Sequence, residues 1–178
     1  MKQNEIILLV GKSGSGKSTI ANELTKQYGL KQLESYTTRS KRKNNEKGHT
    51  FITKEEYKNF NKKDICAYTF FNNNHYFATK QQVEDSDIYI IDVDGIKYFK
   101  EKYKGNKKII TICIKIDTDS RKKRMANRNE KMEDRLKADN VKFKDLDDIN
   151  FDLTLYNKNG MLQDTVFKII EYIQNERK

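Results

Sequence analysis

The chain contains no proline and only two cysteines. The absence of proline removes one usual marker of domain boundaries, and no linker, internal repeat or low-complexity tract interrupts the sequence. Cys66 and Cys113 lie far apart, inside apolar runs and without a CxxC companion, which excludes the spacing of a zinc site or a local disulfide framework. We predict two buried thiols in a single domain of 178 residues.

The N-terminal segment also lacks a targeting or membrane signal. Residues 1–10 carry one lysine and a short apolar run that ends at a glycine loop, which is too short for a signal peptide or a membrane span. We therefore expect a cytoplasmic protein without a membrane partner.

Charge of one sign is in excess, because the formal net charge is +10. Lysine and arginine that neutralise phosphates supply most non-specific affinity for nucleic acids. Here, however, lysine is spread over nearly every polar stretch, as on a solvated surface, and no recognition motif with interleaved aromatic residues occurs. We do not expect a nucleic-acid partner.

Apolar runs alternate with amphipathic segments along most of the chain. Buried strands are predicted at 5–10, 88–91, 109–116 and 152–156, and helices at 18–28, 96–103, 120–128, 135–144 and 161–174. This alternation indicates an α/β fold with a central parallel sheet. Residues 35–84 interrupt it with a capping box at Thr53–Glu56, strands at 66–71 and 75–79, and an asparagine turn between them, which predicts a small inserted subdomain.

Residues 11–18, Gly-Lys-Ser-Gly-Ser-Gly-Lys-Ser, match the G-x-x-x-x-G-K-[ST] phosphate loop between a predicted strand and a predicted helix. Such a loop directs backbone N–H groups at a polyphosphate, and the helix N-terminus adds partial positive charge. We expect Lys17 to reach the β- and γ-phosphates and the Ser18 hydroxyl to ligate Mg²⁺. The motif therefore predicts a P-loop NTPase fold that binds ATP or GTP with Mg²⁺. We take ATP as the expected ligand, and the residues expected to hold it are Gly11, Ser13, Gly14, Ser15, Gly16, Lys17, Ser18 and Thr19.

Two groups of arginines are further candidates for phosphate binding. Arg39 and Arg42 follow the segment Ser35-Tyr-Thr-Thr38, and their guanidinium groups are suited to bidentate phosphate contacts; the alternative is a solvated basic loop. Arg124, Arg128 and Arg135 lie on or beside predicted helices, where they either close over the transferring phosphates or remain surface charges.

Asp92 ends an apolar strand and allows two interpretations. Its carboxylate is placed to hold a metal-bound water or to orient the acceptor. Alternatively, Asp92 or Asp94 caps the helix that begins near Gly95, since aspartate is favoured at that position.

Together these motifs resemble the guanylate kinase family in order and spacing over nearly the whole chain. The match comprises the phosphate loop, the Thr-Thr-Arg-x-x-Arg element within 35–42, residues 46–51, the Asp92-Val-Asp94 strand end, the three arginines and residues 151–157. The resemblance implies a core over 1–34, 86–117 and 146–178, a monophosphate-binding insert over 35–85, and a helical arginine-bearing lid over about 118–145.

The resemblance implies an enzyme that transfers phosphate from ATP to a nucleoside monophosphate, with GMP or dGMP as the expected acceptor. Its catalytic residues would be Lys17, Arg39, Arg124 and Arg135. Ser35, Arg39 and Arg42 would hold the acceptor phosphate, and Phe51 stands where the family has a phosphate-binding tyrosine. Arg128 would lie in the lid and Asn157 near the adenine.

The positions that read the base depart from the family pattern. Where the family has a Glu, a Ser and the second Asp of Asp-x-Asp, the matching residues here are Tyr68, Thr79 and Asp94. A tyrosine in place of glutamate removes a charged acceptor for the guanine N–H groups. A lost bond of about 1.5–3 kcal/mol predicts roughly ten- to hundred-fold weaker guanine selection.

Two alternatives therefore accompany the prediction of a guanylate kinase. One is a kinase for another small phosphorylated acceptor, such as a deoxynucleotide, a modified nucleotide or a sugar phosphate. The other is a non-catalytic binding module with the same fold.

Overall fold

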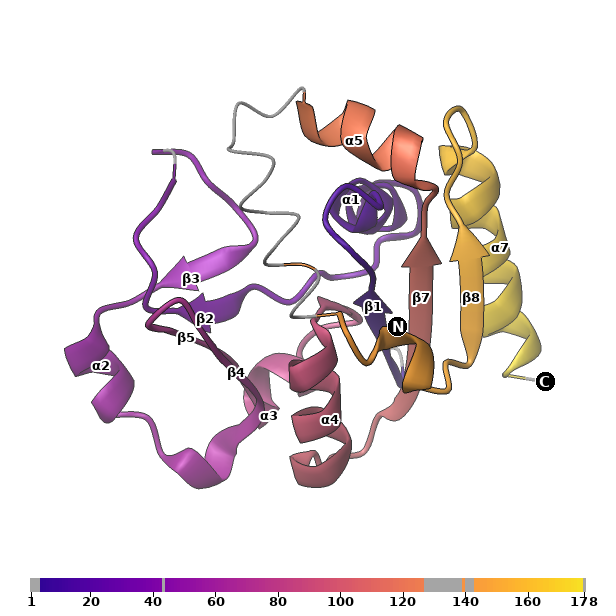
Figure 1. The fold of residues 1–178 in the computed structure, drawn as a ribbon. Helices are drawn as coiled ribbons and strands as arrows, with labels where there is room; N and C mark the ends of the chain where they lie inside the picture. The colour runs from indigo at the N-terminus through magenta and orange to yellow at the C-terminus, as the bar shows by residue number, and fades with distance from the viewer. Residues whose placement is uncertain (1–3, 43, 127–138, 140–142, 178) are drawn as a thin grey trace.

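The computed structural model describes residues 4–42, 44–126, 139 and 143–177, which fold into two four-stranded sheets with flanking helices (Figure 1). Arg128 and Arg135 lie outside the described residues. Of the predicted helix at 135–144, only residues 139, 143 and 144 are described. None of the described helices is both long enough and apolar enough to cross a membrane.

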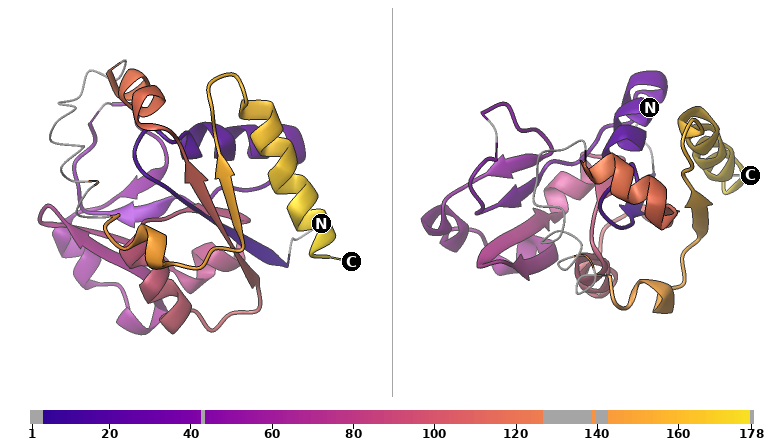
Figure 2. Two further views of the ribbon diagram at one scale, coloured as in Figure 1. Left: turned by 45° about the vertical axis from the view of Figure 1, so that its right-hand side comes forward. Right: turned by 45° about the horizontal axis from the view of Figure 1, so that its top comes forward.

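The central sheet is parallel, with the strand order β6-β1-β7-β8. Its strands are β1 (Glu5–Val10), β6 (Ile88–Ile90), β7 (Lys108–Lys115) and β8 (Leu153–Tyr156). Helices α1 (Lys17–Tyr28) and α7 (Leu162–Asn175) cover one face, and α4 (Val93–Lys102) covers the other (Figures 1 and 2). The predicted α/β fold with a parallel sheet between helical layers is confirmed.

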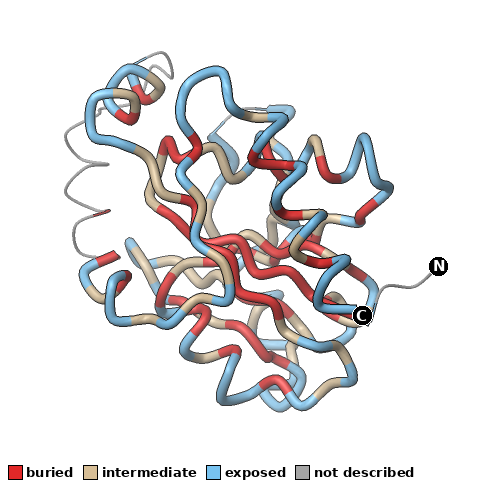
Figure 3. Tube along the Cα trace, turned by 90° about the vertical axis from the view of Figure 1, so that its right-hand side faces the viewer, coloured by how far each residue is buried: buried red, intermediate tan, exposed pale blue. Residues whose placement is uncertain are grey.

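The side chains of β1 show how the sheet holds these layers together. Ile7 and Leu9 are buried with α1 and α7, whereas Ile6, Leu8 and Val10 are buried with α4, because successive side chains of a strand point to opposite faces. All residues of β1 and residues 110–114 of β7 are buried, whereas β8 at the edge of the sheet has no buried residue. Figure 3 shows buried stretches of chain through the centre of the molecule. Cys66 and Cys113 are both buried and free, as predicted.

The second sheet has the order β3-β2-β5-β4 and is formed by β2 (Ser35–Thr37), β3 (His49–Phe51), β4 (Ile65–Phe71) and β5 (Asn74–Thr79). Strands β4 and β5 form a hairpin through Asn72 and Asn73, whose positive φ values of 47° and 58° suit asparagine in a tight turn. The predicted capping box at Thr53 is confirmed and begins α2 (Lys54–Lys58). The sequence did not predict β2, β3 or α3 (Lys80–Glu84).

Strand alternation gives this second sheet two faces of different chemistry. Tyr36, Tyr68 and Phe77 share one face, with His75, and rings of Tyr57 and Phe60 pack on it; we call it the aromatic face. The opposite face carries Ser35, Thr37, His49, Phe51, Thr69 and Tyr76, and we call it the arginine face because Arg39 lies over Phe51.

Candidate functional site

The phosphate loop connects β1 to α1, and three of its consecutive carbonyl oxygens are held from outside. The oxygens of Ser13, Gly14 and Ser15 accept hydrogen bonds from Arg121 Nε at 3.0 Å, Arg124 Nη1 at 3.4 Å and Asn157 Nδ2 at 2.8 Å. A trans peptide directs its N–H group opposite to its carbonyl. The N–H groups that follow Ser13 and Ser15 are thereby turned inward, as anion binding requires.

Lys17 spans the mouth of this loop. Its Nζ donates to the carbonyl oxygens of Gly11 at 2.6 Å and Lys12 at 3.1 Å. Ser18 and Thr19 follow in the exposed first turn of α1, where the N–H groups of a helix lack intrahelical partners. The predicted residues of the loop therefore form one cationic cradle at a helix N-terminus.

Arg124 and Asn157, which are distant in sequence, meet at this cradle. Arg124 lies on α5 (Thr118–Ala126) and donates through Nη2 to the Asn157 carbonyl at 3.0 Å and through Nε to Asn159 Oδ1 at 3.1 Å. Asn157 is 3% exposed, and neither its Oδ1 nor Ser15 Oγ has a hydrogen-bond partner among the described residues. Asn157 Oδ1 and Ser15 Oγ are thus two buried polar atoms at the phosphate loop without a hydrogen bond to the described residues.

A second cationic site lies in the loop after β2. Arg39 forms a bidentate ion pair with Glu46, at 2.8 Å from Nη2 and 3.2 Å from Nη1, and the Arg42 backbone N–H donates to the same carboxylate at 2.6 Å. The hydrogen bond from Arg39 lowers the Glu46 pKa to about 2, so this carboxylate is ionised at neutral pH. Glu46 was part of the recognised motif, but its role as the organiser of both arginine positions was not predicted.

The other predicted acceptor residues on the arginine face lie in this region. Ser35 Oγ and His49 Nδ1 are 3.0 Å apart, and burial lowers the His49 pKa, so the imidazole is neutral at pH 7. The Arg39 guanidinium lies over the Phe51 ring, with 5.3 Å between Arg39 Cζ and the ring centroid. Tyr76 also interacts with Arg39 and was missed, because the hairpin register that places it opposite Thr37 is not visible in the sequence.

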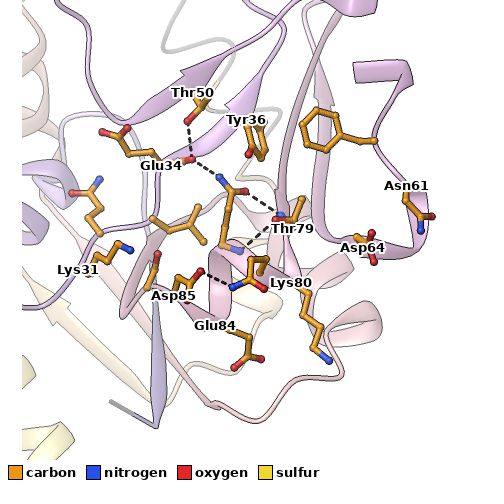
Figure 4. A pocket seen from close by; sticks show the side chains of 16 residues that line it. Lys31, Glu34, Tyr36, Thr50, Asn61, Asp64, Thr79, Lys80, Glu84 and Asp85 are labelled. Atoms are coloured by element: carbon orange, nitrogen blue, oxygen red, sulfur yellow. Dashed lines mark hydrogen bonds between the residues drawn. The ribbon is translucent and has the colours of Figure 1, made fainter. Parts of the chain in front are cut away.

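Tyr68 and Thr79 do not join this group, because both lie on the aromatic face. Tyr68 Oη is 2.8 Å from His75 Nδ1, and burial raises the Tyr68 pKa to about 12. Thr79 Oγ1 accepts from Gln82 N at 3.3 Å as the N-cap of α3 and lines a pocket of about 880 Å³ (Figure 4). No residue of the phosphate loop lines that pocket, and neither do Arg39, Arg42 or Glu46. The placement gives no support to the prediction that Tyr68 and Thr79 read the acceptor base.

Asp92 caps α4, which confirms one of the two interpretations. Its Oδ1 accepts from Gly95 N at 2.9 Å and from Thr69 Oγ1 at 2.7 Å, so it also connects the central sheet to the arginine face. Asp94 is exposed in the first turn of α4. A role of Asp92 toward a metal-bound water stays a prediction.

Comparisons with known proteins agree with this geometry. A family model described as guanylate kinase matches residues 3–176. The guanylate kinase of Mycoplasma genitalium is 32% identical over 172 residues, covering 88% of this chain and 70% of that protein. The guanylate kinase of Clostridium tetani is 28% identical over 185 residues, covering 98% and 86%. The crystal structure of guanylate kinase from Anaplasma phagocytophilum superposes with a TM-score of 0.66 at 19% identity, covering 99% of this chain and 87% of that one.

Proposed function

This chain belongs to the guanylate kinase family, and it is accordingly a nucleoside monophosphate kinase; we propose that its acceptor is GMP, which it converts to GDP with ATP as donor. The observation that supports the proposal is the presence of two separate cationic arrangements in one chain, each suited to bind a phosphate group. One is the backbone cradle of the phosphate loop with Lys17, and the other is the arginine pair organised by Glu46.

In the proposed reaction the loop binds the triphosphate of ATP. Its inward N–H groups and the N-terminus of α1 hold the phosphate oxygens, and Lys17 neutralises charge on the transferring group. Arg124 lies at the same loop, so its guanidinium is placed to stabilise charge that develops during transfer. Arg128 and Arg135 are proposed to act with it.

The acceptor phosphate is proposed to bind Arg39 and Arg42 on the arginine face, with Ser35 and Tyr76 beside them. Guanidinium groups suit this task because they bind phosphate in a bidentate manner and remain charged. Phosphoryl transfer needs little covalent chemistry from the protein, so positioning and charge neutralisation carry most of the rate enhancement.

The residues of the site fit a bound magnesium ion. Mg²⁺ at nucleotide sites takes most ligands from phosphates and water and only one or two from the protein. The Ser18 hydroxyl would provide a direct ligand, and Asp92 would act through a water molecule. When bound, the ion supplies further neutralisation of the phosphate charge.

The comparisons do not support a kinase for another acceptor or a non-catalytic binding module. The relatives that are 32% and 28% identical to this chain are both named guanylate kinases. Against a binding module, Gly16, Lys17 and Ser18 are all present in a formed loop.

The test is an acceptor panel in a coupled assay of ADP release, with GMP, dGMP, AMP, CMP and UMP at saturating MgATP. We expect the highest kcat/KM with GMP. Tight ATP binding without acceptor-dependent ADP release would refute the kinase, and faster turnover of another monophosphate would refute GMP as the acceptor. The Lys17→Met variant controls for contaminating kinases.

A further inference from the structure

Every polar group of Ser13, the third residue of the phosphate loop, is held by one buried ion pair. Asp139 accepts from Ser13 N at 2.8 Å through Oδ2 and from Ser13 Oγ at 2.9 Å through Oδ1. Arg121 donates from Nε to the Ser13 carbonyl at 3.0 Å and from Nη2 to Asp139 Oδ2. The three residues therefore form a closed ring of hydrogen bonds.

Both partners of this ion pair are buried. The side chains of Arg121 and Asp139 are 9% and 6% exposed, whereas those of Lys97 and Asp145, which also form an ion pair, are 52% and 43% exposed. Burial of two charges costs free energy that a pair of apolar residues would not. Stability alone therefore does not explain this pair beside the loop.

Helix α5 contacts the loop at the next residue as well. A Cβ atom added at Gly14 would lie 3.2 Å from Met125 Cγ and 3.4 Å from Arg121 Cγ, so the helix packs directly on the glycine backbone. Arg121 and Met125 are buried, one turn apart on α5. The loop is therefore fixed by packing at Gly14 and by charged hydrogen bonds at Ser13.

We propose that Arg121 and Asp139 are positioning residues that hold the phosphate loop in its ATP-binding shape through Ser13. With the Ser13 carbonyl fixed by Arg121, the N–H group of Gly14 is directed into the cradle. Neither side chain is needed as a phosphate ligand, because the polar contacts named above engage them with Ser13 and with each other. The inference rests on the proposed function only in that ATP is the ligand of this loop.

This role differs from plain structural support in what it predicts for variants. Loss of one partner leaves a buried unpaired charge and is expected to destabilise the fold. Replacement of both by apolar residues, Arg121→Leu with Asp139→Ala, removes the charges together and is often tolerated. Only the positioning role predicts that this folded double variant loses ATP affinity.

The experiment compares the wild type, the double variant R121L/D139A and the matched control K97A/D145A, which removes an exposed ion pair that includes neither Ser13 nor its partners. Three quantities are measured: thermal unfolding, equilibrium binding of a fluorescent ATP analogue, and the KM values for ATP and GMP. We expect R121L/D139A to weaken analogue binding and raise the ATP KM by roughly ten- to a hundred-fold, since charge-assisted bonds to Ser13 are lost. The GMP KM and the control should be unchanged.

Analogue binding by R121L/D139A equal to that of the wild type would overturn the inference. Tighter binding would also overturn it, because the pair would then compete with ATP. If R121L/D139A does not fold, Ser13→Ala replaces it; this variant removes only the Oγ bond to Asp139, and unchanged binding would count against the proposal. The binding measurement does not depend on turnover, so a failure of GMP as acceptor is recognised separately.

Discussion

Substitution of two glycines at opposite ends of α1 separates the chemistry of the phosphate loop from backbone strain. Gly16 and Gly29 have φ values of +96° and +69°, so alanine at either position meets the left-handed penalty of about 1–2 kcal/mol. A Cβ at Gly29 would meet no atom within 4 Å, whereas a Cβ at Gly16 would lie 2.3 Å from Asn157 Nδ2. Gly16→Ala therefore causes a steric clash that Gly29→Ala does not.

The clash has a calculable consequence because Asn157 is buried and bonded. To admit the methyl group, Asn157 must give up its 2.8 Å bond to the Ser15 carbonyl, and an unsatisfied buried carbonyl costs about 1–3 kcal/mol. We therefore expect Gly16→Ala to destabilise the chain by about 2–5 kcal/mol and Gly29→Ala by about 1–2 kcal/mol. A released Ser15 carbonyl also lets the next N–H group turn out of the cradle.

Chemical denaturation and steady-state kinetics test this reasoning on the same preparations. Gly29→Ala should keep the wild-type kcat/KM for ATP, because its strain lies at the far end of α1. Gly16→Ala should lower kcat/KM for ATP by roughly ten- to a hundred-fold, as expected for about 1.4–2.8 kcal/mol of lost phosphate binding. Equal kinetics for the two variants would refute the role assigned to Asn157 and the Ser15 carbonyl.

Further predictions concern the charged groups and the two faces of the second sheet. Lys17→Met should abolish most turnover, because the loss of the ammonium group removes a cation from the phosphate loop; the bonds of Nζ to the backbone carbonyls of Gly11 and Lys12 lie within that loop, so thermal unfolding should stay near that of the wild type. Glu46→Gln should raise the KM for GMP more than that for ATP, since Arg39 loses its bidentate partner. The Glu46 pKa is about 2 in the folded chain against 4.5 for a free carboxyl, so its stabilisation is present above about pH 4.5 and is lost as the pH falls toward 2; acid titration of unfolding should show a flatter dependence for Glu46→Gln. Tyr68→Phe should leave the GMP KM unchanged, because Tyr68 lies on the aromatic face; a raised KM would return it to the acceptor site.

The sequence predicted the core and the phosphate loop because both depend on local patterns. The run Glu5–Val10 and the motif that follows it specify a strand, a glycine loop and a helix without reference to distant residues. The faces of the second sheet were not predictable in this way. A one-residue change of register moves a side chain to the opposite face, and the pairing of Tyr68 with Phe77 becomes visible only in the folded hairpin.

The two proposed phosphate-binding arrangements share a feature that a search for basic residues alone does not find. At each one, a carboxylate organises the donors: Glu46 holds Arg39 and the Arg42 backbone, and Asp139 holds Arg121 and Ser13. An unpaired carboxylate next to a phosphate would repel it. In an ion pair, the cation that the carboxylate orients compensates this negative charge. Removal of either acid should therefore weaken binding of the phosphate nearby, although it also removes a negative charge. Simple charge counting predicts the reverse, so Glu46→Gln discriminates between the two arguments: a lower KM for GMP would show that net charge, and not orientation of the donors, controls acceptor binding.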